Sequence, residues 1–62
     1  MNIFEELSRA NLRVKTRRLK WFCVTDKIIV FYDAFNPCRE VRVERKGTLE
    51  EQILTARKQL RI

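Results

Sequence analysis

The stretch LKWFCVTDKIIVFYD, residues 19–33, contains two runs of aromatic and β-branched residues on either side of a short polar segment. Such runs are typical of β-strands, and Asp26 between them is a residue type that favours tight turns. The pattern therefore predicts a β-hairpin over Leu19–Asp33. Both faces of this hairpin are apolar, so we expect both to be covered in the folded protein.

A third strand is predicted over residues 39–45, REVRVER, after a loop broken at Asn36–Pro37. Val41 and Val43 alternate with charged residues, which is the period of a strand with one face exposed. The outward charges also suit a strand at the edge of a sheet.

A helix is predicted to follow the turn at Lys46–Gly47. Thr48 and Glu51 stand at the spacing of a capping box, which marks a helix start. Apolar residues then recur every three or four positions and form one stripe that would cover the sheet. This stripe consists of Leu49, Ile53, Ala56 and Leu60.

The first eleven residues predict a short helix over NIFEELSRAN, with Asn2 as its cap and Glu5 at the capping-box position. Its apolar residues fall on one face at helical spacing. From Leu12 onward, apolar and basic residues alternate as in a strand, so we expect the basic stretch Arg13–Lys20 to be extended.

These elements predict a single small basic α+β domain over residues 1–62, in the order α-β-β-β-α. A short N-terminal helix precedes a three-stranded antiparallel meander, and the C-terminal helix packs on the sheet. A core of this size rarely supplies more than about 3–5 kcal/mol of net stability. The second apolar face of the hairpin, led by Trp21, Ile28, Val30 and Tyr32, would be covered by the N-terminal helix or by a second copy, and we expect a homodimer.

The composition argues against a disordered, a membrane-spanning and a secreted protein. Hydrophobic residues make up 45% of the chain, which argues against disorder. No apolar run approaches the roughly 20 residues of a membrane span, and the N-terminus is acidic where a secretion signal is basic. We therefore expect a cytoplasmic protein with no membrane partner. In the cytoplasm Cys23 and Cys38 should be free, buried thiols and not a disulfide.

Catalysis finds little support in the sequence. The chain has no histidine, the usual general base near neutral pH, and its one glycine excludes a glycine-rich phosphate loop. Without histidine or a second cysteine pair, a four-ligand zinc site cannot be assembled from the usual residues. We expect no enzyme activity, no metal and no cofactor.

The net charge of +6 favours a polyanion or an acidic protein surface as partner. Lysine and arginine neutralise phosphates, and aromatic rings stack on bases. The candidate nucleic-acid-binding residues are therefore the basic residues of two clusters and two neighbouring aromatic residues. They are Arg13, Lys15, Arg17, Arg18, Lys20, Trp21, Tyr32, Arg39 and Arg42.

Residues 19–61 also resemble the DNA-binding domains at the N-termini of some tyrosine integrases, which are similar in fold to the plant AP2 domain. The shared features are a Trp in strand one, a REVRV-like third strand and a Gly-Thr-x-Glu-Glu entry to the helix. The resemblance implies DNA contact through the sheet by Lys20, Arg39 and Arg42. The layout is also similar to small phage or prophage proteins that bind a host enzyme.

Two functions follow as hypotheses. The first is a small non-enzymatic DNA- or RNA-binding regulator that grips phosphates with the basic stretch beside the sheet. The second is a phage-type inhibitor or adaptor that docks on an acidic surface of a host enzyme. The clustered charge motivates the first, and the apolar hairpin motivates the second.

Overall fold

The computed structural model describes residues 2–62, which fold in the predicted order. Helix α1 (Ile3–Arg13) is followed by strands β1 (Leu19–Val24), β2 (Ile28–Asp33) and β3 (Asn36–Glu44), and helix α2 (Leu49–Leu60) comes last. The strands form one antiparallel sheet in the order β1-β2-β3, which confirms the α+β meander. Among the described residues no helix is both long and apolar enough to cross a membrane.

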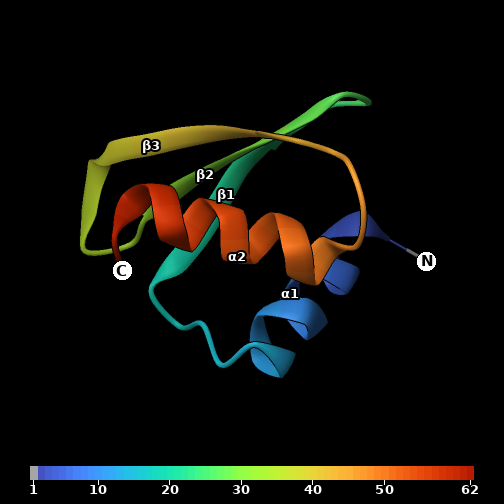
Figure 1. Ribbon diagram of the computed structural model, residues 1–62, viewed down its shortest axis with the longest axis horizontal. Coiled ribbons are helices and arrows are strands. Elements are labelled where there is room, and N and C mark those ends of the chain that lie inside the picture. The colour runs from blue at the N-terminus through green and yellow to red at the C-terminus, as the bar shows by residue number, and fades with distance from the viewer. Residues whose placement is uncertain (1) are drawn as a thin grey trace.

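Both helices lie on the same side of the sheet, as Figure 1 shows with the sheet uppermost, α2 below it and α1 at the bottom. α2 packs on the inner face of the sheet and α1 packs on α2, and the buried residues of all three layers form one core. The buried members of this core are Leu7, Ala10, Leu19, Ile29, Phe31, Val43, Ile53, Ala56 and Leu60.

The expected stripe on α2 is confirmed, and so is its cap. The Thr48 hydroxyl accepts a hydrogen bond from the Glu51 N–H at 3.2 Å, and the Glu51 carboxylate accepts one from the Thr48 N–H at 3.4 Å. Gly47 just before the cap has a φ of +73°, a conformation that side chains rarely adopt. The helix therefore begins where the sequence predicts.

Only Leu19 and Lys20 of the basic stretch lie in a strand, so the expectation that it is extended is wrong for residues 13–18. α1 continues through Arg13, and Lys15 then adopts a left-handed conformation with a φ of 56°. The N–H of Thr16 bonds to the Asn11 carbonyl at 2.8 Å and that of Lys15 to the Leu12 carbonyl at 3.1 Å. This is a Schellman motif, which satisfies the last carbonyls of a helix and turns the chain sharply.

The third strand begins three residues earlier than predicted, at Asn36. Asn36 pairs with Asp33, whereas the next paired residue of β3 is Glu40, opposite Tyr32. Pro37 lies in the irregular segment between these pairs, where its missing N–H costs no ladder hydrogen bond. The predicted loop residue is therefore part of an interrupted strand.

The side of the sheet that faces away from the helices is here called the outer face. An irregularity in β1 between Trp21 and Cys23 shifts the register, so Trp21 faces the core and packs against it. The expectation that Trp21 belongs to the second apolar face is therefore wrong. The outer face consists of Lys20, Phe22, Cys23, Ile28, Val30, Tyr32, Glu40, Arg42 and Glu44.

Neither thiol forms a disulfide. Cys23 is half-buried on the outer face, and Cys38 is exposed, so the expectation of buried thiols is wrong for Cys38. Cys38 lies in the interrupted part of β3, between the paired residues Asn36 and Glu40.

Candidate nucleic-acid interface

A groove runs between the end of α1, the loop over residues 14–18 and the start of β1. It consists of two adjoining hollows of about 280 and 380 Å³ that share four residues. We call it the α1–β1 groove. Its lining residues are Ser8, Asn11, Leu12, Lys15, Thr16, Arg17, Lys20 and Trp21.

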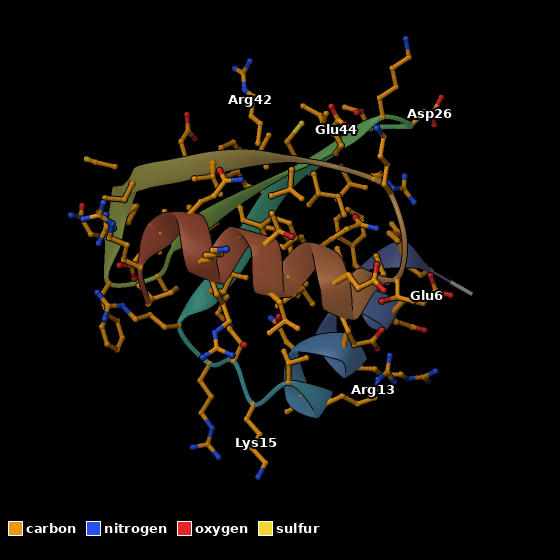
Figure 2. The ribbon with its side chains drawn as sticks, viewed as in Figure 1. Glu6, Arg13, Lys15, Asp26, Arg42 and Glu44 are labelled. Atoms are coloured by element: carbon orange, nitrogen blue, oxygen red, sulfur yellow. The ribbon has the colours of Figure 1, made fainter. Side chains whose placement is uncertain are left out.

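Three cations border this groove, namely Lys15, Arg17 and Lys20. All three side chains are exposed, and none forms an ion pair or hydrogen bond with another described residue. In Figure 2 the Lys15 side chain extends away from the body of the protein. Their charges are therefore available to an anion.

The groove also contains apolar surface. Trp21 is half-buried, with one part against the core and another lining the groove. Leu12, on the last turn of α1, is 75% exposed. Three cations beside an indole and an exposed leucine can bind a ligand that combines negative charge with flat apolar groups.

The floor of the groove is held by hydrogen bonds between elements. Asn11 is 6% exposed, and its side-chain N–H donates to the Leu19 carbonyl at 3.2 Å, which ties α1 to β1. Arg57 donates to the Val14 carbonyl at 3.5 Å, which ties α2 to the loop. The groove is therefore a fixed part of the fold.

Sequence reasoning did not single out Asn11, although a signal was present. Asn11 follows Leu7 and Ala10 at helical spacing and so occupies a buried position on the apolar face of α1. A polar residue at such a position needs a partner, which indicates a tertiary hydrogen bond.

The structure does not bring the other predicted basic residues to this groove. Arg13 is hydrogen-bonded and ion-paired to Glu50 of α2, with a distance of 2.6 Å from its Nε to the carboxylate. The backbone N–H of Glu50, at the start of α2, and then Arg13 hold the pKa of that carboxyl below its ordinary value. Arg13 thus connects the two helices.

Arg18 and Arg39 both lie beside Asp33, which is fully buried at the end of β2. Arg18 donates two hydrogen bonds to this carboxylate, and Arg39 lies 3.8 Å from it while also donating to the Leu60 carbonyl. The guanidinium of Arg18 also stacks over the ring of Phe35 at 4.9 Å. Both guanidinium groups therefore interact with other parts of the protein and stabilise the fold.

Tyr32 and Arg42 lie on the outer face, apart from the groove. Tyr32 contacts the ring of Phe22, with 5.5 Å between the ring centroids. Arg42 points away from the helices in Figure 2. The predicted site thus divides into three parts: the groove, the Asp33 cluster and the outer face.

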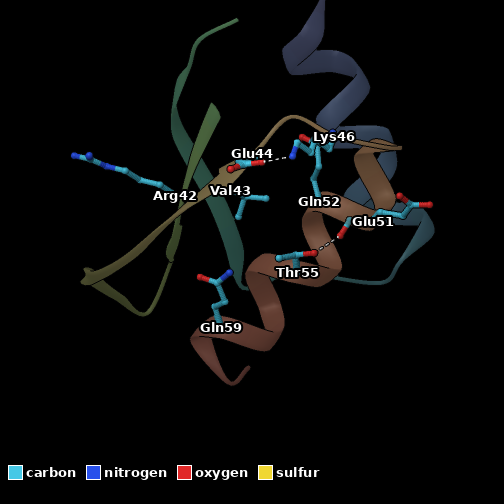
Figure 3. Close-up of a pocket in the computed structure, with 8 residues that line it drawn as sticks. All are labelled: Arg42, Val43, Glu44, Lys46, Glu51, Gln52, Thr55 and Gln59. Carbon is cyan, nitrogen blue, oxygen red and sulfur yellow. Dashed lines mark hydrogen bonds and ion pairs between the residues drawn. The ribbon is translucent and has the colours of Figure 1, made fainter. Parts of the chain in front are cut away.

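A further hollow of about 420 Å³ lies between β3 and α2, with the lining residues that Figure 3 shows. Its charged groups are largely paired with one another. Lys46 bonds to Glu44 at 2.9 Å, and Glu51 belongs to the helix cap. It therefore offers less unpaired charge than the α1–β1 groove. Among residues 2–62 no group of three metal-ligating side chains comes together.

Comparison with protein-family models, with curated proteins and with solved structures found no match for this chain.

Proposed function

We propose that the protein is a small non-enzymatic nucleic-acid-binding protein and that the α1–β1 groove is its binding site. The observation that carries the proposal is that three unpaired cations, Lys15, Arg17 and Lys20, line the same groove as the half-buried Trp21. In this arrangement the cations neutralise successive phosphates while the indole stacks on a base.

The geometry favours single-stranded nucleic acid over a duplex. Stacking on Trp21 needs a base whose flat face is free, which a duplex does not offer. The groove also lacks a helix or strand that projects from the surface and could enter a major groove. Duplex DNA would meet only the cations.

The test is a titration of the protein with a fluorescently labelled single-stranded oligonucleotide at several salt concentrations. Each neutralised phosphate releases counterions, so the logarithm of the affinity should fall with that of the salt concentration, by about 0.7 per contact for a single strand. Replacing Lys15, Arg17 and Lys20 together by alanine should remove about two units of this slope.

A matched control replaces three exposed cations elsewhere, Lys27, Lys58 and Arg61, and so changes the net charge by the same amount. If the groove is the site, this control keeps most of the slope and of the affinity. Equal losses in both variants would mean that only the overall charge matters and would contradict the proposal.

An acidic polypeptide such as polyglutamate separates this function from docking on an acidic protein. Polyglutamate offers charge without bases, so it should compete only weakly with the oligonucleotide for the groove. Competition at equal charge would favour the second hypothesis, a module that binds an acidic protein surface.

A further inference from the structure

The outer face of the sheet is the one large surface that the described chain leaves without a covering element. α2 packs on the inner face and α1 packs on α2, whereas Phe22, on the edge strand β1 of the outer face, is 58% exposed. Isolated exposed apolar residues are common on proteins, but Phe22 has the half-buried Ile28 and Tyr32 as neighbours in the same sheet, with the side chain of Val30, 6% exposed, between them. A contiguous patch of this kind marks an interaction surface.

The strand register arranges this face in rows. One row runs Lys20, Tyr32, Glu40 across the three strands, so that it carries a cation at one end and a carboxylate at the other. The next row runs Cys23, Val30, Arg42, with Phe22 beside Cys23 in the irregular part of β1. The apolar column of the face is therefore β2, and the charges lie on its two sides.

We propose that this face packs against the same face of a second copy of the chain, about a two-fold axis that runs parallel to β2. This axis places β1 of each copy over β3 of the other. Lys20 then faces Glu40 of the second copy, and the same contact occurs twice by symmetry. Arg42 comes to lie over the β1 side of the second copy, where the exposed ring of Phe22 offers a cation–π partner.

The other two-fold axis in the plane of the interface runs across the strands, and the charges disfavour it. About that axis each strand lies over its own copy in the opposite direction. Arg42 would then face Arg42 of the second copy, and Glu40 would face Glu44. Like charges brought together at an interface are costly. The charge pattern thus selects the axis parallel to β2, which also gives the aligned packing common in β-sandwiches.

The interface is small. Three strands of about six residues present a face of roughly 14 by 20 Å, whereas a standard interface buries about 800 Å² per partner. We therefore expect a weak dimer, with a dissociation constant in the micromolar range.

The test is a charge exchange followed by sedimentation in the absence of nucleic acid. Lys20→Glu and Glu40→Lys each turn both symmetric contacts into like-charge contacts, so each variant alone should dimerise at least about 100-fold more weakly than the natural chain. When the two variants are mixed, both contacts again join opposite charges. The mixture should therefore restore a species of twice the 7.5 kDa chain mass.

Two controls make the result specific. Lys27→Glu changes an exposed charge in the hairpin turn, outside the proposed interface, and should leave the dimer intact. Glu40→Lys alters no residue of the α1–β1 groove, so it should lose self-association while it keeps oligonucleotide binding. Lys20 belongs to both proposed surfaces, so Glu40→Lys, which leaves Lys20 in place, is the variant that tests self-association and oligonucleotide binding separately.

Crosslinking tests the axis itself. In a chain with Cys23 and Cys38 replaced by serine, Ile28→Cys places a thiol on the column that faces its own copy, and oxidation should give a covalent dimer. About the other axis Ile28 would face Tyr32, and no such bridge would form. A natural chain that stays monomeric at high micromolar concentration, or variants that fail to associate when mixed, would overturn the proposal.

Discussion

The guanidinium of Arg18 and the carboxylate of Asp33 meet in a two-pronged contact, with hydrogen bonds of 2.7 and 2.8 Å. The same carboxylate accepts the N–H of Phe35 at 2.9 Å, which shapes the turn between β2 and β3. Asp33 is fully buried, so its charge depends on these partners. Asp33, the last residue of the predicted hairpin, thus holds together the end of the sheet where β2 turns into β3.

This contact predicts that stability depends on acidity. The hydrogen bonds from Arg18, and then that from Phe35, hold the pKa of the Asp33 carboxyl below its ordinary value. The stabilisation is therefore complete above the unfolded-state pKa, about 3.9, and is lost as the pH falls through the lower folded-state pKa. Thermal unfolding from neutral pH to about pH 2 should show the midpoint fall over this window.

Asp33→Asn should lower the unfolding midpoint at neutral pH and flatten its fall in acid, because the variant has no carboxylate to protonate. Asp26→Asn, in the exposed hairpin turn, is the matched control. If both variants followed the natural chain in parallel at every pH, Asp33 would not be the group responsible.

Lys15→Gly should change stability and binding in opposite directions. The left-handed conformation costs a lysine roughly 1 kcal/mol that glycine does not lose, so the variant should be more stable by about that amount. It also removes a groove cation and should weaken oligonucleotide binding.

Arg61→Gly is a closely matched control for this change. Arg61 ends α2 in the same left-handed conformation, with a φ of 58°, but does not line the α1–β1 groove. Chemical denaturation should show a similar gain for both variants, and only Lys15→Gly should bind less tightly. If both variants lost the same affinity for the oligonucleotide, Lys15 would not be part of the binding site.

Trp21 is the only tryptophan of the chain, so its fluorescence reports on the α1–β1 groove alone. A single-stranded oligonucleotide should quench this emission as it binds. Trp21→Leu keeps an apolar side chain against the core but removes the stacking surface, and should cost about 1–3 kcal/mol of binding free energy. An unchanged emission at saturation would show that bases do not reach the indole.

Leu7 and Phe4 should differ sharply in their effect on stability. Leu7 is fully buried between α1 and the rest of the core, whereas Phe4 is 49% exposed. Leu7→Ala should therefore cost about 2–5 kcal/mol, enough to unfold much of so small a domain, and Phe4→Ala well under that. Urea unfolding monitored by circular dichroism measures both, and similar costs would contradict the packing of α1.

Gly47→Ala should also destabilise the protein, by about 1–2 kcal/mol. A Cβ at this position would lie 2.0 Å from the Glu51 carboxylate that caps α2, and the φ of +73° disfavours any side chain. The variant would have to release the cap or strain the turn. Gly47→Asn, which tolerates this conformation better, should restore part of the loss if the backbone contributes.

The order of elements could be predicted because the patterns that carry it are local. The hairpin over Leu19–Asp33, the alternation at Val41 and Val43, and the Thr48–Glu51 capping box each depend on neighbours in the chain. The end of α1 could not be predicted in the same way. α1 runs through Arg13, Lys15 adopts a conformation usual for glycine, and Asn11 bonds to Leu19, eight residues away, which is a contact without a local pattern.

For the candidate site, the sequence could indicate which basic and aromatic residues to consider, but not which of them line the α1–β1 groove. Charge and aromaticity indicated Lys15, Arg17, Lys20 and Trp21, but the same criteria selected Arg18 and Arg39 equally well. Those two arginines pair with a buried carboxylate, a tertiary relationship with no local signature. Likewise, the shift in β1 that turns Trp21 inward comes from pairing with β2.

The Schellman motif at the end of α1 has a consequence for the rate of the proposed binding to nucleic acid. Because backbone hydrogen bonds within residues 10–16 already fix the turn that carries Lys15, a ligand does not have to order it. Little conformational entropy is then lost on binding. Association should be limited by diffusion and by the attraction between opposite charges, so salt should slow the encounter as well as weaken the complex.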